Sequence, residues 1–413
     1  MLVADALAAV RPFTEELYRE LHEHPELSHQ EYRTATRMAD ELGRSGADVH
    51  ERVGDSTGVV GILRNGDGPT VLLRADMDAL PVTEEMGVPY RSTRTAQWEG
   101  QAVGVMHACG HDTHMAALQA AVRVLAQCRD QWRGTVVAVF QPAEETMEGA
   151  AGMVADLRRL VPTVDVALGQ HVASFPAGTV HLSPGPVMAI SHHLRITVHG
   201  RGGHGSIPDA TVDPIVLAAA IVLRLQTIVS REVSPSERVV LSVGTFHAGT
   251  KVNIIPASAT IELNVRAFDD AVAERVIAAI ERIVHGECLA SGAPQPPTIE
   301  RGRCAPLTTN DDAATARLHR AFTDAFGDAV LPLAPRMGSE DFAHLPNAYG
   351  APAVFWMFGG IDPATHAAAD ARGTVGADVP SLHAATFQPV LQPTLATATR
   401  AMTTAALTFL ETA

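Results

Sequence analysis

The sequence predicts an α/β protein in which a mostly parallel sheet flanked by helices is interrupted by a smaller, inserted α+β unit. Three observations support this fold class. The chain has 413 residues, more than one hydrophobic core usually organises. Apolar strand segments alternate with helical segments in its first part, which is typical of parallel sheets. Its middle part follows the order β-α-β-β-α-β, the ferredoxin-like arrangement.

The first elements are helices and short strands. Apolar side chains recur three or four positions apart over residues 4–24, and a second helix is expected over 31–42, ended by Gly43. Short strands are predicted at 58–63 and 70–74 around a turn rich in Asn, Gly and Asp. The second of these strands leads directly into a pair of aspartates.

Further apolar strands also end in polar side chains. The run TVVAVF, 135–140, is continuously apolar, as in a strand buried on both faces of a sheet. Another strand is expected over 164–171. In open α/β sheets the functional site lies at the carboxyl ends of the strands. We therefore expect one rim of the sheet to gather five side chains: Asp76, Asp78, Glu144, Glu145 and His171.

The stretch MHACGHDTH, 106–114, adds a thiol and an imidazole to this rim. Cys109 and His111 are two positions apart, so both can face one side of a loop. A helix is predicted from His111 to Cys128, with Asp112 as its cap. The helix dipole would then favour the Cys109 thiolate, and a thiolate beside an imidazole is a metal-ligand pair. The alternative for Cys109 is a small buried hydrophobic residue.

The other rim residues also have alternative interpretations. His107 and His114 could support the ligands from behind or cap the helix. Two adjacent carboxylates repel, so a site that holds Glu144 and Glu145 together gives them separate tasks, such as metal ligand and proton acceptor. The alternative is a solvated loop pair. By itself, His171 is as compatible with a hydrogen-bonded core histidine as with a ligand.

The inserted unit is predicted between a Pro/Gly-rich hinge at 183–188 and Pro306. The expected boundaries are 1–188 and 305–413 for the larger domain and 189–304 for the insert. Its predicted strands and helices are 192–199, 213–230, 238–246, 258–267, 270–290 and 297–303. After the insert we expect a helix at 311–326, a strand at 352–358, a surface loop at 360–380 and a last helix that His383 opens.

Three residues of the insert stand out. His204 lies in a Gly-rich loop, RGGHGSIP, that lacks the GxGxxG pattern of a phosphate-binding loop. Asn253 precedes a Pro turn, and Arg266 ends an alternating strand. Taken separately, these are most simply an exposed histidine, a turn residue and a solvated charge.

Composition excludes several classes of protein. The net charge of −15 leaves no excess of basic residues to neutralise phosphates, so nucleic acid is not an expected partner. Four scattered cysteines do not form a disulfide scaffold in a chain of this length. The sequence shows neither a secretory signal at its start nor an apolar run long enough for a membrane span. We expect a cytoplasmic protein.

Motifs spread over nearly the whole chain resemble those of the M20 metallopeptidase family. In particular the chain is similar to the amidohydrolase branch, which contains aminoacylases, hippurate hydrolases and indole-acetyl-amino-acid hydrolases. The motifs are LRADMDALP (73–81), MHACGHDTHMA (106–116), QPAEE (141–145), GQH (169–171), GRGGHGS (200–206), NIIPA (253–257), MGSEDF (337–342) and LHAATF (382–387).

The resemblance implies a catalytic domain with an inserted ferredoxin-like dimerisation (lid) domain, and therefore a homodimer or dimer-based oligomer. It implies Glu144 as the general base and Asp78 as the residue that orients a ligand. His204 and Asn253 would stabilise the oxyanion in a neighbouring subunit's site, and Arg266 would bind the substrate's carboxylate. The implied ligands of one or two divalent ions are Cys109, His111, Glu145, His171 and His383.

One departure distinguishes this chain from the peptidase branch, whose members have His-x-Asp where this chain has Asp76-Met77-Asp78. The change removes one imidazole ligand. It fits the branch of the family whose members have a cysteine at the position of Cys109. A thiolate favours Zn²⁺ over Mg²⁺ or Ca²⁺, with Mn²⁺, Co²⁺ and Ni²⁺ as alternatives.

The implied reaction is hydrolysis of N-acyl L-amino acids, with acetyl, benzoyl, aryl-acetyl or longer acyl groups. The alternatives within the family are a metallo-dipeptidase and an N-acetyl-diamino-acid deacetylase. Outside catalysis, the alternative is a metal-binding relative without turnover, which should have lost Glu144 or a ligand. None of them is missing from this chain.

Overall fold

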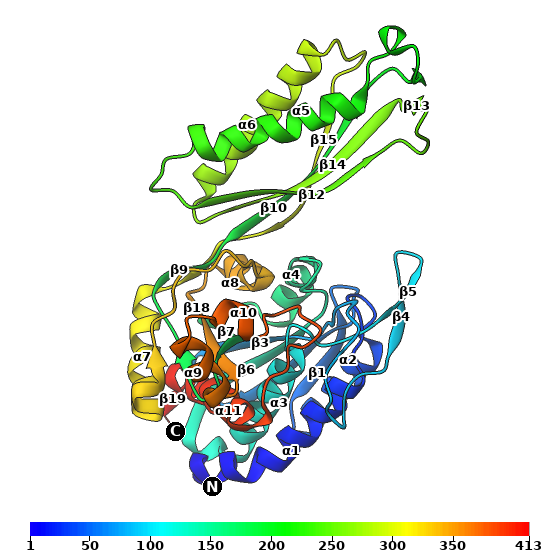
Figure 1. The fold of residues 1–413 in the computed structure, drawn as a ribbon. Helices are drawn as coiled ribbons and strands as arrows, with labels where there is room; N and C mark the ends of the chain where they lie inside the picture. The colour runs from blue at the N-terminus through cyan, green and yellow to red at the C-terminus, as the bar shows by residue number, and fades with distance from the viewer. Residues whose placement is uncertain (413) are drawn as a thin grey trace. The chain divides into compact units, whose positions relative to one another are not determined.

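The computed structural model describes residues 1–412, in which the chain forms two compact units (Figure 1). The larger unit comprises Met1–Val187, Thr309–Ala334 and the chain from Asp341 onward. The smaller unit comprises Met188–Thr308 together with Pro335–Glu340, a short segment that the sequence did not assign to it.

The larger unit is built on a nine-stranded sheet whose four central strands, β6, β3, β7 and β18, run parallel to one another. Nearly every residue of these four strands is buried, because helices cover the sheet. In order, the strands are β1 (Asp48–Val53), β2 (Gly58–Asn65), β6 (Trp132–Gln141), β3 (Thr70–Asp76), β7 (Val166–Pro176), β18 (Ala353–Ile361), β8 (Val180–His181) and β17 (Val330–Leu331), with β19 (Glu411–Thr412) on β6.

Helix α3, His111–Gln127, is the most deeply buried helix of this unit. It packs against β3, β7 and the helices α1 and α11, so its side chains are enclosed on most sides. The other helices are α1 (Val3–Glu23), α2 (Tyr32–Arg44), α4 (Gly149–Leu160), α7 (Asp312–Phe326), α8 (His344–Tyr349), α9 (Pro363–Ala371), α10 (Val375–Asp378) and α11 (Leu391–Phe409). The remaining short strands are β4 (Thr95–Trp98), β5 (Gln101–Gly104), β9 (Gly185–Met188) and β16 (Thr308–Asn310).

Two expectations for the C-terminal part were wrong. The last helix begins at Leu391, not at His383, which lies in a loop with a positive φ of 68°. The segment expected to be a surface loop contains the helices α9 and α10. Asp362 caps α9 by accepting a hydrogen bond from the backbone N–H of Thr365.

The smaller unit has the ferredoxin-like order β10-α5-β12-β14-α6-β15, and its sheet is antiparallel with the spatial order β12-β14-β10-β15. Side chains of β14 alternate between buried and half-exposed, because only one face of the sheet carries helices. The elements are β10 (Ile190–His199), α5 (Pro214–Thr227), β12 (Val239–Ala248), β14 (Ser258–Ala267), α6 (Asp270–Ala290) and β15 (Thr298–Ala305), with a ribbon of β11 (Gly203–His204) and β13 (Ile254–Ile255).

Helix α5 and the turn after it, Pro214–Glu232, form the one stretch of residues 1–412 that is long and apolar enough to cross a membrane. One side of α5 is buried in this unit, through Leu217, Ile221 and Leu225. Its other side is exposed, and Leu223 there has 73% of its surface accessible.

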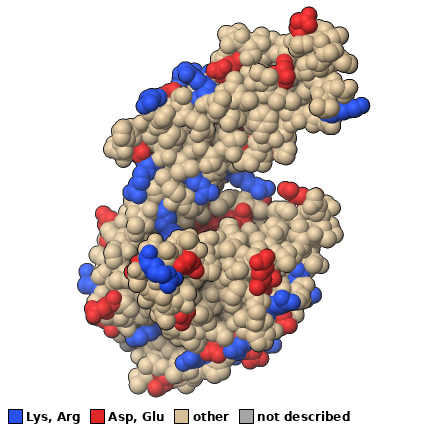
Figure 2. All heavy atoms as spheres, in the orientation of Figure 1, with Lys and Arg blue, Asp and Glu red and all other residues tan. Residues whose placement is uncertain are grey.

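Charged side chains are interspersed on the surface. Figure 2 shows basic and acidic residues side by side over the visible face of the larger unit. No continuous basic surface is visible on that face, in keeping with the net charge of −15.

Candidate metal centre

The rim at the carboxyl ends of the central strands gathers the side chains that the sequence singled out. Strand β3 ends at Asp76, and Asp78 follows it; Glu144 and Glu145 follow β6 after a short loop. His171 belongs to β7, the other neighbour of β3. Parallel strands end on the same side of a sheet, so these residues meet there.

Cys109 is surrounded by three of these candidate ligands. Its Sγ lies 3.5 Å from Nε2 of His171 and 3.3 Å from Nε2 of His383. The same nitrogen of His383 is 3.4 Å from a carboxylate oxygen of Glu145. Ligand atoms of Cys109, Glu145 and His383 all lie within 4.8 Å of one another.

His111 joins this group through Nε2. Its Nδ1 lies 2.8 Å from the backbone oxygen of Asp78 and donates to it, so Nε2 is the nitrogen left to bind a cation. Nε2 is 3.9 Å from Glu145 and 4.0 Å from Glu144. It is buried and has no hydrogen-bond partner among residues 1–412, and the same is true of Oε1 of Glu145.

These donor atoms fit a divalent cation. Ligands held about 2.0–2.3 Å from a tetrahedral ion stand roughly 3.3–3.8 Å from each other. The Cys109–His171, Cys109–His383 and Glu145–His383 separations lie in that range. A bound ion would also supply a partner for the buried nitrogen of His111 and oxygen of Glu145, which have no hydrogen bond; an unpaired buried polar atom is otherwise costly. The set of thiol, imidazoles and carboxylate suits Zn²⁺.

The electrostatics of the rim also favour a cation. Burial lowers the pKa of His111, but Asp76, Asp78 and Glu145 outweigh it and raise that pKa to about 10. The carboxylates therefore create a strongly negative potential at Nε2, which attracts a proton or a metal ion.

The expected thiolate of Cys109 was wrong for the metal-free protein. Cys109 does lie just before α3, but burial and the charges of Glu145 and Glu144 raise the pKa of its thiol well above the usual value. Desolvation and like charges outweigh the helix dipole here. Positive charge from a bound ion would reverse the balance.

The expected cap of α3 was also wrong. The N-cap position is Gly110, in a left-handed conformation, and no side chain caps the helix. Asp112 instead binds the backbone N–H of its neighbour Thr113 and, through its other oxygen, Nδ1 of His22 at 2.6 Å.

The loop that carries Glu144 and Glu145 is held in a strained conformation. Ala143 before them and Met147 after them have positive φ angles of 52° and 56°. Such angles cost about 1–2 kcal/mol for a residue with a Cβ, so the surroundings must stabilise them. Oδ2 of Asp78 accepts a hydrogen bond from the N–H of Glu145 at 3.0 Å and so holds the loop between these two residues.

Glu31 holds the other end of this loop and was missed in the sequence. Its carboxylate accepts hydrogen bonds from the backbone N–H of Ala143 at 2.9 Å and from the hydroxyl of Thr57 at 2.7 Å. Burial and the nearby Asp78 raise the pKa of Glu31 to about 7. The sequence signal was present in HPELSHQE, 24–31, which reads only as a turn until the loop is seen beside it.

The three candidate residues of the smaller unit have their own surroundings. His204 and Asn253 are exposed in the ribbon of β11 and β13, where Nδ1 of His204 accepts a hydrogen bond from the N–H of Ser206. Arg266 is half-buried and donates to Asn264 at 2.8 Å and to the carbonyl of Met337 at 2.7 Å.

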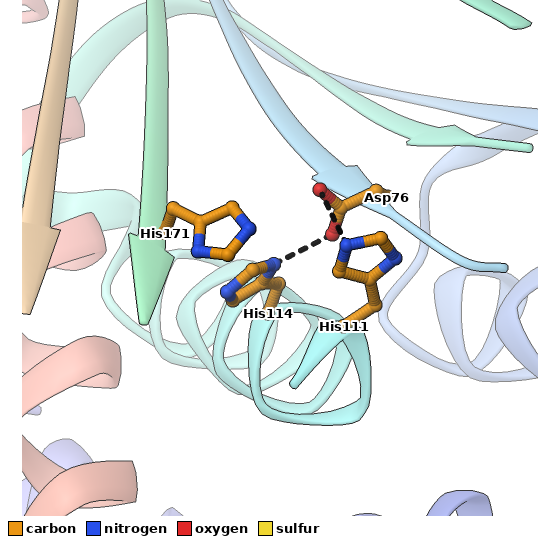
Figure 3. Close-up of side chains that lie close together, drawn as sticks. All are labelled: Asp76, His111, His114 and His171. Atoms are coloured by element: carbon orange, nitrogen blue, oxygen red, sulfur yellow. Dashed lines mark hydrogen bonds and ion pairs between the residues drawn. The ribbon is translucent and has the colours of Figure 1, made fainter. Parts of the chain in front are cut away.

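Figure 3 shows a second group, formed by Asp76, His111, His114 and His171, which shares its first and last histidines with the candidate ligands above. Asp76 comes from β3, the first two histidines from α3, and His171 from β7. One ligand atom from each of these residues lies within 4.8 Å of the others, and all four residues are buried.

Comparison with known proteins identifies the family. Residues 72–374 match the family model described as peptidase family M20/M25/M40. The chain belongs to this family. The resemblance stated from the sequence motifs is thereby confirmed, and so is the α/β fold class, because the solved relatives have the same architecture.

Several curated M20 relatives are similar over most of the chain. A hippurate hydrolase of Campylobacter jejuni is 38% identical over 79% of this chain and 83% of its own length. An N-acetyl-L-cysteine deacetylase of Bacillus subtilis is 34% identical over 80% of this chain and 78% of its own. Thermostable carboxypeptidase 2 of Saccharolobus solfataricus is 37% identical over 83% of this chain and 85% of its own.

The solved M20 structures agree over nearly the full length. One described as a putative aminohydrolase from methicillin-resistant Staphylococcus aureus has a TM-score of 0.84 and 32% identity, covering 98% of each chain. Another, the Bacillus subtilis YXEP protein, is described as a dinuclear metal-binding peptidase; its TM-score is 0.75 and its identity 27%, over 97% of this chain and 98% of its own. With its amidohydrolase relatives, this chain is an enzyme that acts on amides.

Proposed function

We propose that this M20 enzyme is a metal-dependent amidohydrolase that releases free L-amino acids from their N-acyl derivatives. The observation that carries the proposal is the buried Glu144 beside donor atoms spaced for a cation. The names of three relatives support the substrate class: hippurate hydrolase, N-acetyl-L-cysteine deacetylase and IAA-amino acid hydrolase.

The proposed ligands of one or two divalent ions are the five residues whose donor atoms meet at the rim, namely Cys109, His111, Glu145, His171 and His383. Zn²⁺ is the ion we expect, with Mn²⁺, Co²⁺ and Ni²⁺ as alternatives. When bound, such an ion polarises the amide carbonyl and lowers the pKa of water from about 15.7 toward roughly 7.

Glu144 would perform the proton transfers. Its carboxylate would take a proton from the attacking water and deliver it to the amide nitrogen, which leaves as the amine. Positioned proton transfer of this kind contributes roughly 10²–10⁴-fold to the rate. Asp78 would keep the loop in place through the N–H of Glu145 and hold His111 through its backbone oxygen.

The smaller unit would complete the site. His204 and Asn253 would donate hydrogen bonds to the developing oxyanion, where one lost donor costs about 3–4 kcal/mol. Their exposure in the ribbon leaves both free to reach the site of a neighbouring subunit. Arg266 would bind the substrate carboxylate, for which its fork of N–H donors is suited.

A homodimer formed through the smaller unit is part of this proposal. Strand β12 lies at the edge of its sheet, and large apolar side chains on this unit are exposed. An open strand edge next to exposed apolar residues favours association of two copies.

We also propose a cytoplasmic location, because a ligand thiol such as Cys109 persists in a reducing compartment.

A substrate panel tests the proposal. N-acetyl, N-benzoyl and indole-acetyl L-amino acids are compared with dipeptides and N-acetyl-diamino acids, each with and without a chelator. We expect hydrolysis of the blocked substrates, lost on chelation and restored by Zn²⁺ or Mn²⁺. Preference for a free α-amino group would instead favour a dipeptidase, and cleavage of blocked peptides would match the carboxypeptidase relative.

Replacement of Glu144 tests its role as the base. Glu144→Gln keeps the shape of the side chain but cannot accept a proton, so we expect kcat to fall by about 10²–10⁴-fold. Metal content should stay at the wild-type level, because Glu144 is not among the proposed ligands. Full activity of the purified variant on the best substrate would refute the assignment.

A further inference from the structure

Asp76 is a buried carboxylate whose two oxygens are both engaged. Oδ2 accepts a hydrogen bond from Nη1 of Arg74 at 2.7 Å, and Oδ1 lies 2.6 Å from Nδ1 of His114 (Figure 3). Arg74 is itself fully buried and also pairs with Asp341 at 3.2 Å. A charge in such a place must be paired, and here one guanidinium is shared by two carboxylates.

The ring of His114 has a defined tautomer. The backbone N–H of Val172 donates to Nε2 at 2.8 Å, so Nε2 carries a lone pair and no proton. Nδ1 must then carry the proton and donate it to Asp76. Neither nitrogen has a lone pair left for a metal ion. Although its ring lies close to His111 and His171, His114 is therefore not a ligand.

The hydrogen bond from Val172 acts directly on His171. That N–H belongs to the peptide unit that joins the two residues, and Nδ1 of His171 lies 2.6 Å from the carbonyl oxygen of Val172. The ring of His171 thus carries its proton on Nδ1, and Nε2 faces the thiol of Cys109 at 3.5 Å. The backbone of Val172 is thus held at its N–H by His114, and its carbonyl oxygen keeps the ring of His171 directed at the candidate metal position.

We propose that Arg74, Asp76 and His114 form a positioning relay that fixes the backbone at Val172 and so holds His171 ready to bind the metal ion. The inference rests on the proposed metal-dependent function. It assigns a role to Asp76, the residue that stands where peptidase members have a ligand histidine. In this chain that position supports the ligands from behind, since Asp76 holds Arg74 and His114 by hydrogen bonds and its Oδ2 lies 3.6 Å from Nε2 of His111.

Two variants of His114 distinguish the hydrogen bond made by Nδ1 from the one made by Nε2. In His114→Asn the amide nitrogen takes the place of Nδ1, so the bond to Asp76 is kept and the bond from Val172 is lost. In His114→Gln the amide oxygen takes the place of Nε2, so the bond from Val172 is kept. The affinity for Zn²⁺ is measured by competition with a chromogenic chelator, and the melting temperature of each metal-free protein serves as a folding control.

We expect the Kd for Zn²⁺ to rise about 10–100-fold in His114→Asn, which is typical when the partner of a metal ligand is lost. In His114→Gln, which keeps the bond from Val172 but loses the bond to Asp76, the Kd should rise less than in His114→Asn. Unchanged affinity in His114→Asn, or equal weakening in both variants, would overturn the relay. A wild-type protein that does not bind Zn²⁺ would instead refute the proposed function.

A measurement on the wild type avoids the risk that a variant does not fold. Nitrogen-15 NMR of the histidine side chains in the metal-free protein reports which ring nitrogen carries the proton. We expect His114 and His171 both to carry it on Nδ1. A proton on Nε2 of His114 would contradict the relay, because that nitrogen could then not accept the bond from Val172.

Discussion

Hydrogen bonds from the ring nitrogens decide what each histidine at the rim is able to do. In His111 and His171, Nδ1 faces a backbone oxygen, so Nε2 is available to a cation. In His114 both nitrogens are used within the protein. Of these three neighbouring histidines, two are therefore candidate metal ligands, and the third supports the protein around them.

Glu31 should contribute both to stability and to the placement of Glu144. Glu31→Ala leaves the N–H of Ala143 and the hydroxyl of Thr57 without their acceptor, which typically costs about 1–3 kcal/mol. Glu31→Gln keeps an acceptor for Ala143 and is the matched control. Urea unfolding should show a clear loss for the alanine variant and a smaller one for glutamine. Equal stability of wild type and Glu31→Ala would exclude this role.

The thiol of Cys109 should react slowly in the metal-free enzyme. Because burial and neighbouring carboxylates raise its pKa, it stays protonated at neutral pH, and the rate of alkylation should rise with pH beyond pH 9. The rate is followed by mass spectrometry of the Cys109 peptide, with the half-buried Cys304 as an internal comparison. Rapid alkylation at pH 7 would show that the thiolate is already formed.

The sequence indicated which residues belong to the site, but not the charges and hydrogen bonds that surround them. Cys109 could be singled out by its spacing from His111, and Glu145 and His171 because they come at the carboxyl ends of buried strands. The pKa of Cys109 could not be inferred, because it depends on carboxylates that only the folded chain brings near. Glu31 was missed for the same reason, since its partner Ala143 is distant in sequence.

At the scale of elements, a buried charge cluster connects α1 to α3. His22 of α1 lies 2.6 Å from Asp112 of α3 and 3.2 Å from Glu84. Burial lowers the pKa of His22, but the hydrogen bonds to these two carboxylates outweigh it and raise the pKa to about 9. The protonated imidazole thus holds the start of α3, and with it His111, against α1.

This cluster predicts a pH-dependent stability. A histidine with a raised pKa stabilises the fold fully below its unfolded value of about 6.5, and the contribution, roughly 3 kcal/mol, is lost as pH rises through about 9. Melting temperatures between pH 6.5 and 9.5 should fall in the wild type and change less in His22→Gln. Parallel curves for the two proteins would show that His22 does not carry the effect.

Strands and helices could be predicted where the apolar periodicity extends over many residues. The errors occur where proline residues decide the start of a helix. The last helix was expected to begin at His383, but the residue before a proline is disfavoured in a helix, and Gln388 precedes Pro389. The element α11 begins at Leu391, and Gln392, before Pro393, still has non-helical φ and ψ. Helix α9 was missed although Asp362 followed by Pro363 is a helix-start signal.

At the scale of the whole molecule, the exposed side of α5 should mediate dimerisation. Leu223→Glu places a charge on this apolar surface, so we expect dissociation to monomers in size-exclusion chromatography with light scattering. Gln226→Glu, on the same helix and already polar, is the control. If the dimer persists in Leu223→Glu, the interface lies elsewhere; if an active monomer appears, His204 does not act across subunits.

The smaller unit is discontinuous in sequence, and this limits how the protein can be divided. Pro335–Glu340 returns to it after the larger unit has resumed, and Arg266 donates to the carbonyl of Met337 in that segment. A fragment that ends at Thr308 would lack Met337, and the half-buried guanidinium of Arg266 would lose this hydrogen-bond acceptor. Domain-swap chimaeras within the family should therefore exchange both segments together.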